Sequence, residues 1–270
     1  MKEELISICK HSGIVHSQPL TSGHITEQFI DEHGICYISS GALSVAEVAQ
    51  TSVYQAGDTI VFRKNILAKF KKLATADQGF KSITIIFDTD MLRAFSKKVE
   101  MEKNTLNKTN DAIVQVKGDL KLLENFFSTL SPYFEESLPQ DLMALKKQEA
   151  LMLLLRQMPQ WKNVVFDFGQ PGKIDLESFM EQNFRFNVPL TKLAVLTGRS
   201  LATFKRDFDK IFHTTPSRWL QKRRLEEAHF LISEKRQRPS DIYHAIGFET
   251  IAHFSHSFKQ HFGITPSSIH

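Results

Sequence analysis

Hydrophobic positions recur with two different periods along the chain. Between residues 25 and 90, short runs of β-branched and aromatic residues are separated by Gly and Asp, as at Gly41 and in the step from Gln55 to Asp58. Such runs, punctuated by residues that favour tight turns, are typical of short strands. The runs are 34–39, 43–45, 53–54, 59–62 and 82–87. This pattern predicts a small antiparallel barrel or sandwich.

From about residue 118 the apolar spacing changes to three and four residues. It holds from Leu120 to Leu130, and again through Leu142, Leu145 and Met152, which predicts two amphipathic helices. These helices either complete the core of the domain or, as the apolar run 151–155 suggests, form a subunit interface.

Residues 159–172 read as a linker, because Pro159, Gly169, Pro171 and Gly172 punctuate them. We expect the apolar segment 164–166 within this linker to pack against another part of the protein.

The chain repeats itself at an offset of 50 residues: residues 200–217 align without a gap with residues 250–267. Three phenylalanines in each copy fall at i, i+4 and i+8, so each copy forms a helix with one apolar stripe to bury. They are Phe204, Phe208 and Phe212 in the first copy, and Phe254, Phe258 and Phe262 in the second.

Each copy opens with a hydroxyl residue, Ser200 or Thr250, that can cap the first free amides of a helix. The face opposite the phenylalanines carries small and polar residues. They are Ala202, Lys205 and Arg206 in the first copy, and Ala252, His253 and His256 in the second. Small residues let a helix approach base edges, and polar residues can hydrogen-bond to them.

A shorter helical stretch ending in a glycine precedes each copy, at 190–198 and at 241–247. A short helix, a turn with glycine and a second helix make a helix-turn-helix, whose second helix enters the major groove of DNA. Residues 216–232 between the two units read as one helix of roughly 26 Å. Such a spacer could hold two recognition helices in successive major grooves, roughly 34 Å apart.

The charge of +4 is unevenly distributed. Residues 1–172 carry 19 basic and 20 acidic side chains, a net of −1, whereas residues 173–270 carry 15 and 10, a net of +5. The basic third is therefore the expected site for a polyanion.

Residues 188–268 resemble the DNA-binding domain of the AraC/XylS family of transcription regulators. The resemblance is carried by Leu193-Ala194, Gly198-Arg199-Ser200, the segment 224–228, Gly247-Phe248, the phenylalanines of the second copy, Gly263 and Pro266. It implies that Ala202, Lys205 and Arg206 face the bases of one groove, and Ala252, His253 and His256 those of the next. It also implies phosphate contacts from Arg199, Ser200, Thr250 and Lys259.

Two departures from the family pattern stand out. His213 occupies a position where glycine is common, and histidines replace the more usual base-reading groups of the second helix. The base preference of the second half-site is therefore open.

The family also places a cupin-like sensor barrel before the DNA-binding domain, and residues 25–90 are similar to one. The resemblance therefore implies an α+β protein with four parts. These are a cupin-like antiparallel barrel at 1–115, a helical dimerisation or packing region at 116–158, a linker at 159–172, and an all-α domain with two helix-turn-helix units at 173–270. In such a family the barrel takes a small effector or docks a regulatory protein, and both alternatives stay open.

A bound metal or other cofactor is not expected. His11, His16, His24 and His33 lack the spacing of a metal-binding cupin. His253 and His256 could bind a metal together with His244 or His261, but no third ligand falls in register.

The remaining features exclude other classes of protein. The first 13 residues contain no apolar run long enough for a signal peptide, and no later apolar stretch is long enough to span a membrane. We therefore expect a cytoplasmic protein. Cys9 and Cys36 are too few for a disulfide framework and are expected to be packing residues. No phosphate loop, nucleophile elbow or metal triad indicates an enzyme.

The expected partners are double-stranded DNA, RNA polymerase and a second copy of the chain. The rival hypothesis is a protein-docking module whose tandem helices bind a partner other than DNA.

Overall fold

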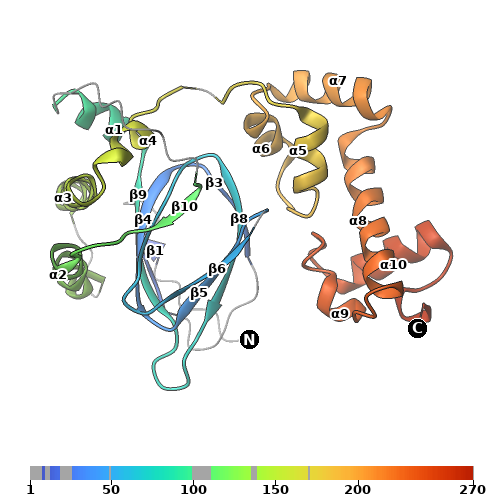
Figure 1. The fold of residues 1–270 in the computed structure, drawn as a ribbon, viewed down its shortest axis with the longest axis horizontal. Helices are drawn as coiled ribbons and strands as arrows, with labels where there is room; N and C mark the ends of the chain where they lie inside the picture. The colour runs from blue at the N-terminus through green and yellow to red at the C-terminus, as the bar shows by residue number, and fades with distance from the viewer. Residues whose placement is uncertain are drawn as a thin grey trace. The chain divides into compact units, whose positions relative to one another are not determined.

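The computed structural model describes residues 8–9, 13–18, 26–48, 50–98, 111–134, 139–169 and 171–269. Its chain forms two compact units, one made of residues 1–26 and 30–169 and the other of residues 27–29 and 170–270. The strands lie almost entirely in the first unit, and the second unit is helical (Figure 1). The α+β class expected from the sequence is confirmed.

The described strands form two sheets, in which the recorded pairings are antiparallel. The first sheet has the order β1 (Ile8–Cys9), β2 (Ile14–Ser17), β9 (Lys81–Phe87), β4 (His33–Ser40), β7 (Thr59–Phe62) and β10 (Ile113–Gln115). The second has the order β3 (Thr26–Ile30), β8 (Ile66–Leu73), β5 (Ala42–Ala46) and β6 (Thr51–Gln55). The central strand β4 places Cys36 opposite Ile60 of β7 and Thr84 of β9.

Alternation along β4 divides the core of this unit in two. Ile35 belongs to a cluster with the helices, whereas Cys36 and Ile38 belong to a second cluster with Leu43 and Tyr54 of the other sheet. Because side chains of a strand point to opposite faces in turn, one strand serves both clusters. This explains why β4 is buried along most of its length.

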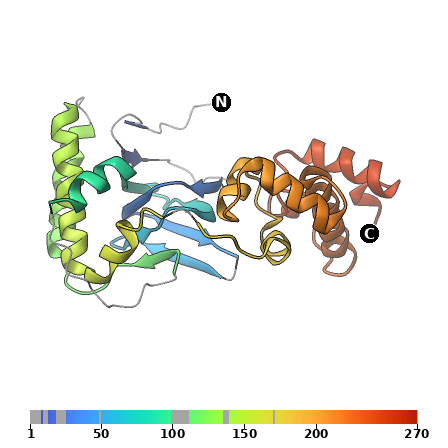
Figure 2. The same ribbon diagram turned by 90° about the horizontal axis from the view of Figure 1, so that it is seen from above.

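Helices cover the first sheet on the face that carries Ile35 (Figures 1 and 2). They are α1 (Thr89–Ser96), α2 (Lys121–Leu130), α3 (Gln140–Gln157) and α4 (Lys162–Val165), with 3₁₀ turns at Ser131–Phe134 and Pro159–Trp161. Asp88 caps α1 by accepting a hydrogen bond from the Met91 amide at 2.8 Å, and it also pairs with Lys147 of α3. Although burial raises the pKa of Asp88, the hydrogen bonds from Lys147 and Met91 outweigh it and lower the pKa.

Two of the apolar residues whose spacing predicted α3 lie on its exposed side. Leu145 and Met152 are each 61% exposed, whereas the buried residues of α3 are Met143, Lys147, Ala150, Leu151, Leu154 and Leu155. Both sets of residues recur at helical spacing, and the larger set, from Met143 to Leu155, is the one buried against the rest of the first unit. The helix therefore has apolar residues on two faces.

The segment expected to be a linker begins inside the first unit. Trp161, Val164 and Val165 are buried in the cluster shared by the helices and the first sheet. The prediction that 164–166 packs against the protein is confirmed. The residues that leave this unit without helix or strand are 167–169.

The second unit contains the helices expected from the repeat and from the segments around it, and also α5, which the sequence analysis did not predict. They are α5 (Leu176–Asn183), α6 (Leu190–Leu196), α7 (Leu201–Phe212), α8 (Pro216–Ser233), α9 (Pro239–Ile242) and α10 (Ile251–Phe262), followed by a 3₁₀ turn at Pro266–Ser268. Helices α6 and α7 form the first helix-turn-helix, α9 and α10 form the second, and α8 joins them.

Candidate nucleic-acid interface

Helix α7 presents the predicted residues on its exposed face. It starts at Leu201 because the Ser200 Oγ accepts a hydrogen bond from the Thr203 amide at 3.2 Å. Phe204 and Phe208 are fully buried, so the opposite side of the helix must face solvent. Ala202, Lys205 and Arg206 lie on that side and are exposed.

Helix α10 repeats this arrangement. The Thr250 Oγ1 accepts from the His253 amide at 3.2 Å, and Phe254 and Phe258 are fully buried. Ala252, His253 and His256 are exposed on the other face, as is Lys259. The sequence repeat thus becomes a repeat of two capped helices with equivalent solvent-facing stripes.

Aromatic packing fixes each recognition helix against its neighbours. The ring centroids of Phe208 and Phe212 lie 4.3 Å apart, and Phe212 lies 4.8 Å from Trp219 of α8. In the second helix-turn-helix, the ring centroid of Phe262 lies 4.6 Å from that of Phe258 and 4.9 Å from that of His229 of α8. Helix α8 therefore touches the aromatic stripe of both recognition helices.

Arg224 of α8 holds the two halves of this domain together. Its guanidinium donates to the carbonyls of Phe184 at 2.7 Å, Phe186 at 3.0 Å and Gly247 at 3.0 Å. Gly247 has a φ of +96°, and a Cβ there would lie 2.9 Å from that guanidinium. A glycine at this turn is thus required by both backbone conformation and close packing.

Further polar contacts join α5 and the segment that follows it to α8 and to the second helix-turn-helix. Asn187 donates to Glu249 at 3.0 Å, Arg223 donates to Glu181 at 3.0 Å, and Arg185 pairs with Glu227. Arg223 and Arg224 of the basic run at 222–224 are therefore engaged inside the domain, and Lys222 is the exposed member of the run.

Arg199, expected at a phosphate, is surrounded by acceptors of its own chain. It donates to Asp207 at 3.1 Å, to the Thr197 carbonyl at 2.7 Å and to the Ile174 carbonyl at 3.0 Å, and its side chain is 10% exposed. The hydrogen bond from Arg199 lowers the pKa of Asp207. This geometry favours a structural role for Arg199.

The cations of α7 stand in contrast to Arg199. The Arg206 side chain is 65% exposed, and its nearest carboxylate, Asp207, lies at 3.5 Å. An exposed pair of this kind adds little stability, so it leaves the guanidinium available to a ligand. Lys205 is exposed and has no hydrogen bond or ion pair within the described part of the chain.

Two further residues of the same stripes were missed by sequence reasoning. Asp209 follows Lys205 by four residues and Arg206 by three, and Gln260 follows His256 by four; both are exposed. Helical spacing beyond the first two turns could have found them. A carboxylate in such a stripe can accept from the cytosine amino group, and an amide can pair with adenine.

The comparisons with known proteins agree with this geometry. The family described as "Helix-turn-helix domain" matches residues 193–269, and the family described as "ExsA N-terminal regulatory domain" matches residues 33–164. The chain is 30% identical over 149 residues to the virulence regulon transcriptional activator VirF of Yersinia enterocolitica. That alignment covers 54% of this chain and 55% of VirF, so the chain spans about half the length of this relative. It is 23% identical over 240 residues to the HTH-type transcriptional regulator ExsA of Pseudomonas aeruginosa, covering 87% of this chain and 85% of ExsA.

This chain belongs to the AraC family of transcription regulators. Its matched relatives are transcription regulators and not enzymes. A solved structure of an apo ToxT variant from Vibrio cholerae strain SCE256 aligns with 95% of the chain and 96% of ToxT, at 12% identity and a TM-score of 0.45.

The regulatory domain of this AraC-family protein buries a cluster of apolar residues between its two sheets. Ile38, Tyr54, Ile60 and Phe80 are buried between its two sheets with other apolar residues. Cys36 is buried there as a free thiol, as expected of a packing residue, and burial raises its pKa. The side chain of Cys9 lies outside the described residues.

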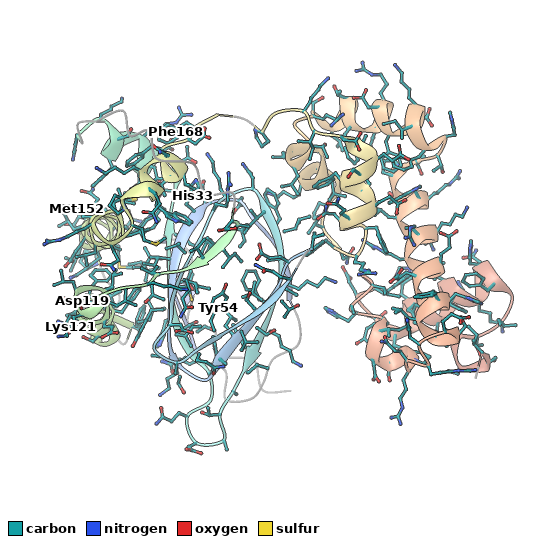
Figure 3. All side chains as sticks on the ribbon, viewed as in Figure 1. His33, Tyr54, Asp119, Lys121, Met152 and Phe168 are labelled. Atoms are coloured by element: carbon teal, nitrogen blue, oxygen red, sulfur yellow. The ribbon has the colours of Figure 1, made fainter. Side chains whose placement is uncertain are left out.

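One histidine of the domain is deeply buried. His33 accepts a hydrogen bond from the Lys64 amide through Nδ1 at 3.2 Å, and its Nε2 has no partner (Figure 3). Burial, helped by Lys64 and Arg63, lowers the pKa of His33 to about 3. A permanently neutral imidazole in this place is a core residue. Among the candidate cupin histidines, His16 is buried at a sheet strand, and His11 and His24 lie outside the described residues.

Neither a metal-binding cluster nor a membrane-crossing helix occurs among the described residues. No group of three or more His, Cys, Asp or Glu side chains in this part of the chain is placed to hold a metal ion. None of its helices combines the length and the apolar character that a membrane-crossing helix needs.

Proposed function

We propose that this protein is a sequence-specific DNA-binding activator of transcription that reads two successive major grooves. The observation that carries the proposal is the pair of capped helices, α7 and α10, that expose equivalent stripes 50 residues apart. Exposed cations in the first stripe match the guanine N7 and O6 acceptors, which are the commonest targets of Arg and Lys.

In this proposal the two helices read DNA unequally. Lys205 and Arg206 make direct base contacts through α7, with Ala202 allowing close approach. Ala252, His253 and His256 read the second groove more loosely through α10, because an imidazole lacks the forked donors of a guanidinium. Thr250 and Lys259 hold phosphates beside α10, and Ser200 reaches one beside α7 in addition to capping it.

The test is anisotropy of the purified full chain on genomic promoter fragments across a salt series. A few fragments should be retained selectively, and their affinity should fall steeply with salt because phosphate contacts release counterions. Uniform, salt-insensitive binding would favour the protein-docking alternative.

The first unit is proposed to control this activity. The control comes from a small effector or from a regulatory protein that binds this unit. RNA polymerase is the further partner that an activator needs. The place of action is the cytoplasm, where bacterial DNA lies, and no catalytic activity is proposed.

We also propose that α2 and α3 form a homodimer interface. Leu122, Leu145 and Met152 are large apolar residues of these two helices and are more than half exposed (Met152 is labelled in Figure 3). The buried sides of α2 and α3 pack against the first sheet, and their exposed sides carry these apolar residues. Such a surface is suited to an isologous contact between two copies of the chain.

A further inference from the structure

A basic groove lies between α8 and α10, outside the residues that the family resemblance assigns to DNA. Its volume is ≈ 190 Å³, and it is lined by Arg218, Gln221, Lys222 and Leu225 of α8 and by Ser257, Gln260 and His261 of α10. The lining contains two permanent cations and no carboxylate. Because one water occupies roughly 30 Å³ of liquid, the groove has room for a phosphate group together with water.

Most polar side chains that line the groove make no strong contact with the rest of the chain. Arg218, Gln221 and Gln260 have no hydrogen bond or ion pair within the described part of the chain, and all three are exposed. Lys222 faces Glu226 at 3.7 Å in a pair whose side chains are 65% and 44% exposed. Such an exposed pair is weak, so the ammonium can turn to a stronger anion. Arg224, by contrast, which lies six residues after Arg218 on α8, donates to three backbone carbonyls of the domain.

The groove is continuous with the base-facing side of α10. Gln260 lies on the stripe of His253 and His256, seven and four residues after them, and it also lines the groove. A helix in the major groove is flanked by the phosphates of both strands. Because α8 lies beside α10 on the flank that carries Gln260, an α10 inserted into the major groove would bring the phosphates of one strand close to this groove.

We propose that the groove is a phosphate seat that clamps one backbone phosphate of the DNA strand flanking α10. Arg218 and Lys222 supply the charge, and Gln221 and Gln260 supply neutral donors. The proposal rests on the DNA-binding function proposed above. The clamp anchors the second helix-turn-helix through the DNA backbone, which suits a helix whose proposed base-reading residues include no Lys or Arg.

The first test compares Arg218→Gln with the wild-type full chain on two duplexes, one selected by the wild-type protein from a random pool and one scrambled. The slope of log K against log salt should become less steep by about 1, because one phosphate contact is lost. Affinity should fall by the same factor on both duplexes. Lys235→Gln removes an exposed cation outside the groove and is the matched control, with a smaller change expected in both quantities. An Arg218→Gln variant that folds, as shown by unchanged thermal unfolding, and binds like the control would overturn the proposal.

A second test locates the contact. Phosphates of the selected duplex are replaced one at a time by neutral methylphosphonate. One position beside the second major groove should weaken the wild-type protein and leave Arg218→Gln unaffected. Equal sensitivity of both proteins at every position would also overturn the proposal.

A third measurement separates DNA phosphate from free phosphate. Thermal unfolding of the full chain without DNA is followed as inorganic phosphate replaces chloride at matched ionic strength. We expect no stabilisation that depends on Arg218. A stabilisation lost in Arg218→Gln would assign the groove to a free phosphate ligand instead. If the wild-type protein selects no duplex at all, the proposed function fails, and this outcome is distinct from failure of the clamp.

Discussion

His213 and Gly263 occupy the same position in the two copies of the repeat and adopt the same backbone conformation. Each follows the last residue of a recognition helix and is left-handed, with φ of 52° at His213 and 78° at Gly263. A non-glycine residue is strained in this region because its Cβ crowds the following carbonyl. The departure from glycine noted in the sequence therefore costs stability in the first copy only.

His213→Gly should raise the free energy of unfolding of the second unit by about 0.5–1 kcal/mol, because relief of the strain exceeds the added entropy of the unfolded chain. Gly263→Ala is the reciprocal control and should lower the free energy of unfolding by about 1 kcal/mol, because alanine is strained at this positive φ. No atom lies within 4 Å of the added Cβ, so a steric clash does not contribute. Urea unfolding followed by Trp219 fluorescence in a Trp161→Phe background measures both. A loss of stability in His213→Gly would show that the imidazole makes contacts that outweigh the strain.

At this scale, sequence reasoning placed exposed residues better than it placed buried partners. The exposure of Lys205, Arg206 and His256 follows from their spacing relative to the phenylalanines, and the structure agrees. The surroundings of Arg199 could not be predicted, because one of its acceptors, the Ile174 carbonyl, is 25 residues away in sequence. Arg224 was hidden in the same way, since its three carbonyl acceptors come from distant turns.

Among the elements, strands β4, β5, β6, β7 and β9 were predicted, whereas several other elements were missed, among them β8 and α1. Strand β8 carries Lys69, Lys71 and Lys72 within its eight residues, so its alternation is masked by charge. Helix α1 is short, and its limits depend on the cap at Asp88. Both elements are defined by tertiary contacts more than by local propensity.

The exposed face of α3 carries the dimer proposal. Leu145→Glu combined with Met152→Glu should convert a dimer into a monomer in sedimentation equilibrium. In an isologous contact the same patch of both copies meets, so the new carboxylates of one copy would repel those of the other. Val53→Lys, which replaces a 50% exposed apolar residue on β6, should leave the dimer intact. A dimer that survives the double substitution would move the interface away from α3, and a monomer produced by Val53→Lys would place it on the second sheet.

For the whole molecule, the 50-residue repeat was the strongest signal in the sequence, because each copy needs the same cap, the same buried stripe and the same turn. The division of charge, a net of +5 after residue 172, agrees with the position of both recognition helices. The first unit gave a weaker signal, since a barrel-like pair of sheets can serve many functions. What that unit responds to depends on how its side chains are arranged in space, which periodicity does not describe.

The central claim is that α7 reads bases through Arg206. The most direct measurement is selection from a pool of randomised duplexes by the full chain, carried out with the wild-type protein, Arg206→Ala and His256→Ala. Arg206→Ala should lose the preference for guanine at one position of the first half-site, a discrimination of about 1–3 kcal/mol, and keep the second half-site unchanged. His256→Ala should change the second half-site only. Identical preferences for the wild-type protein and Arg206→Ala would contradict the account.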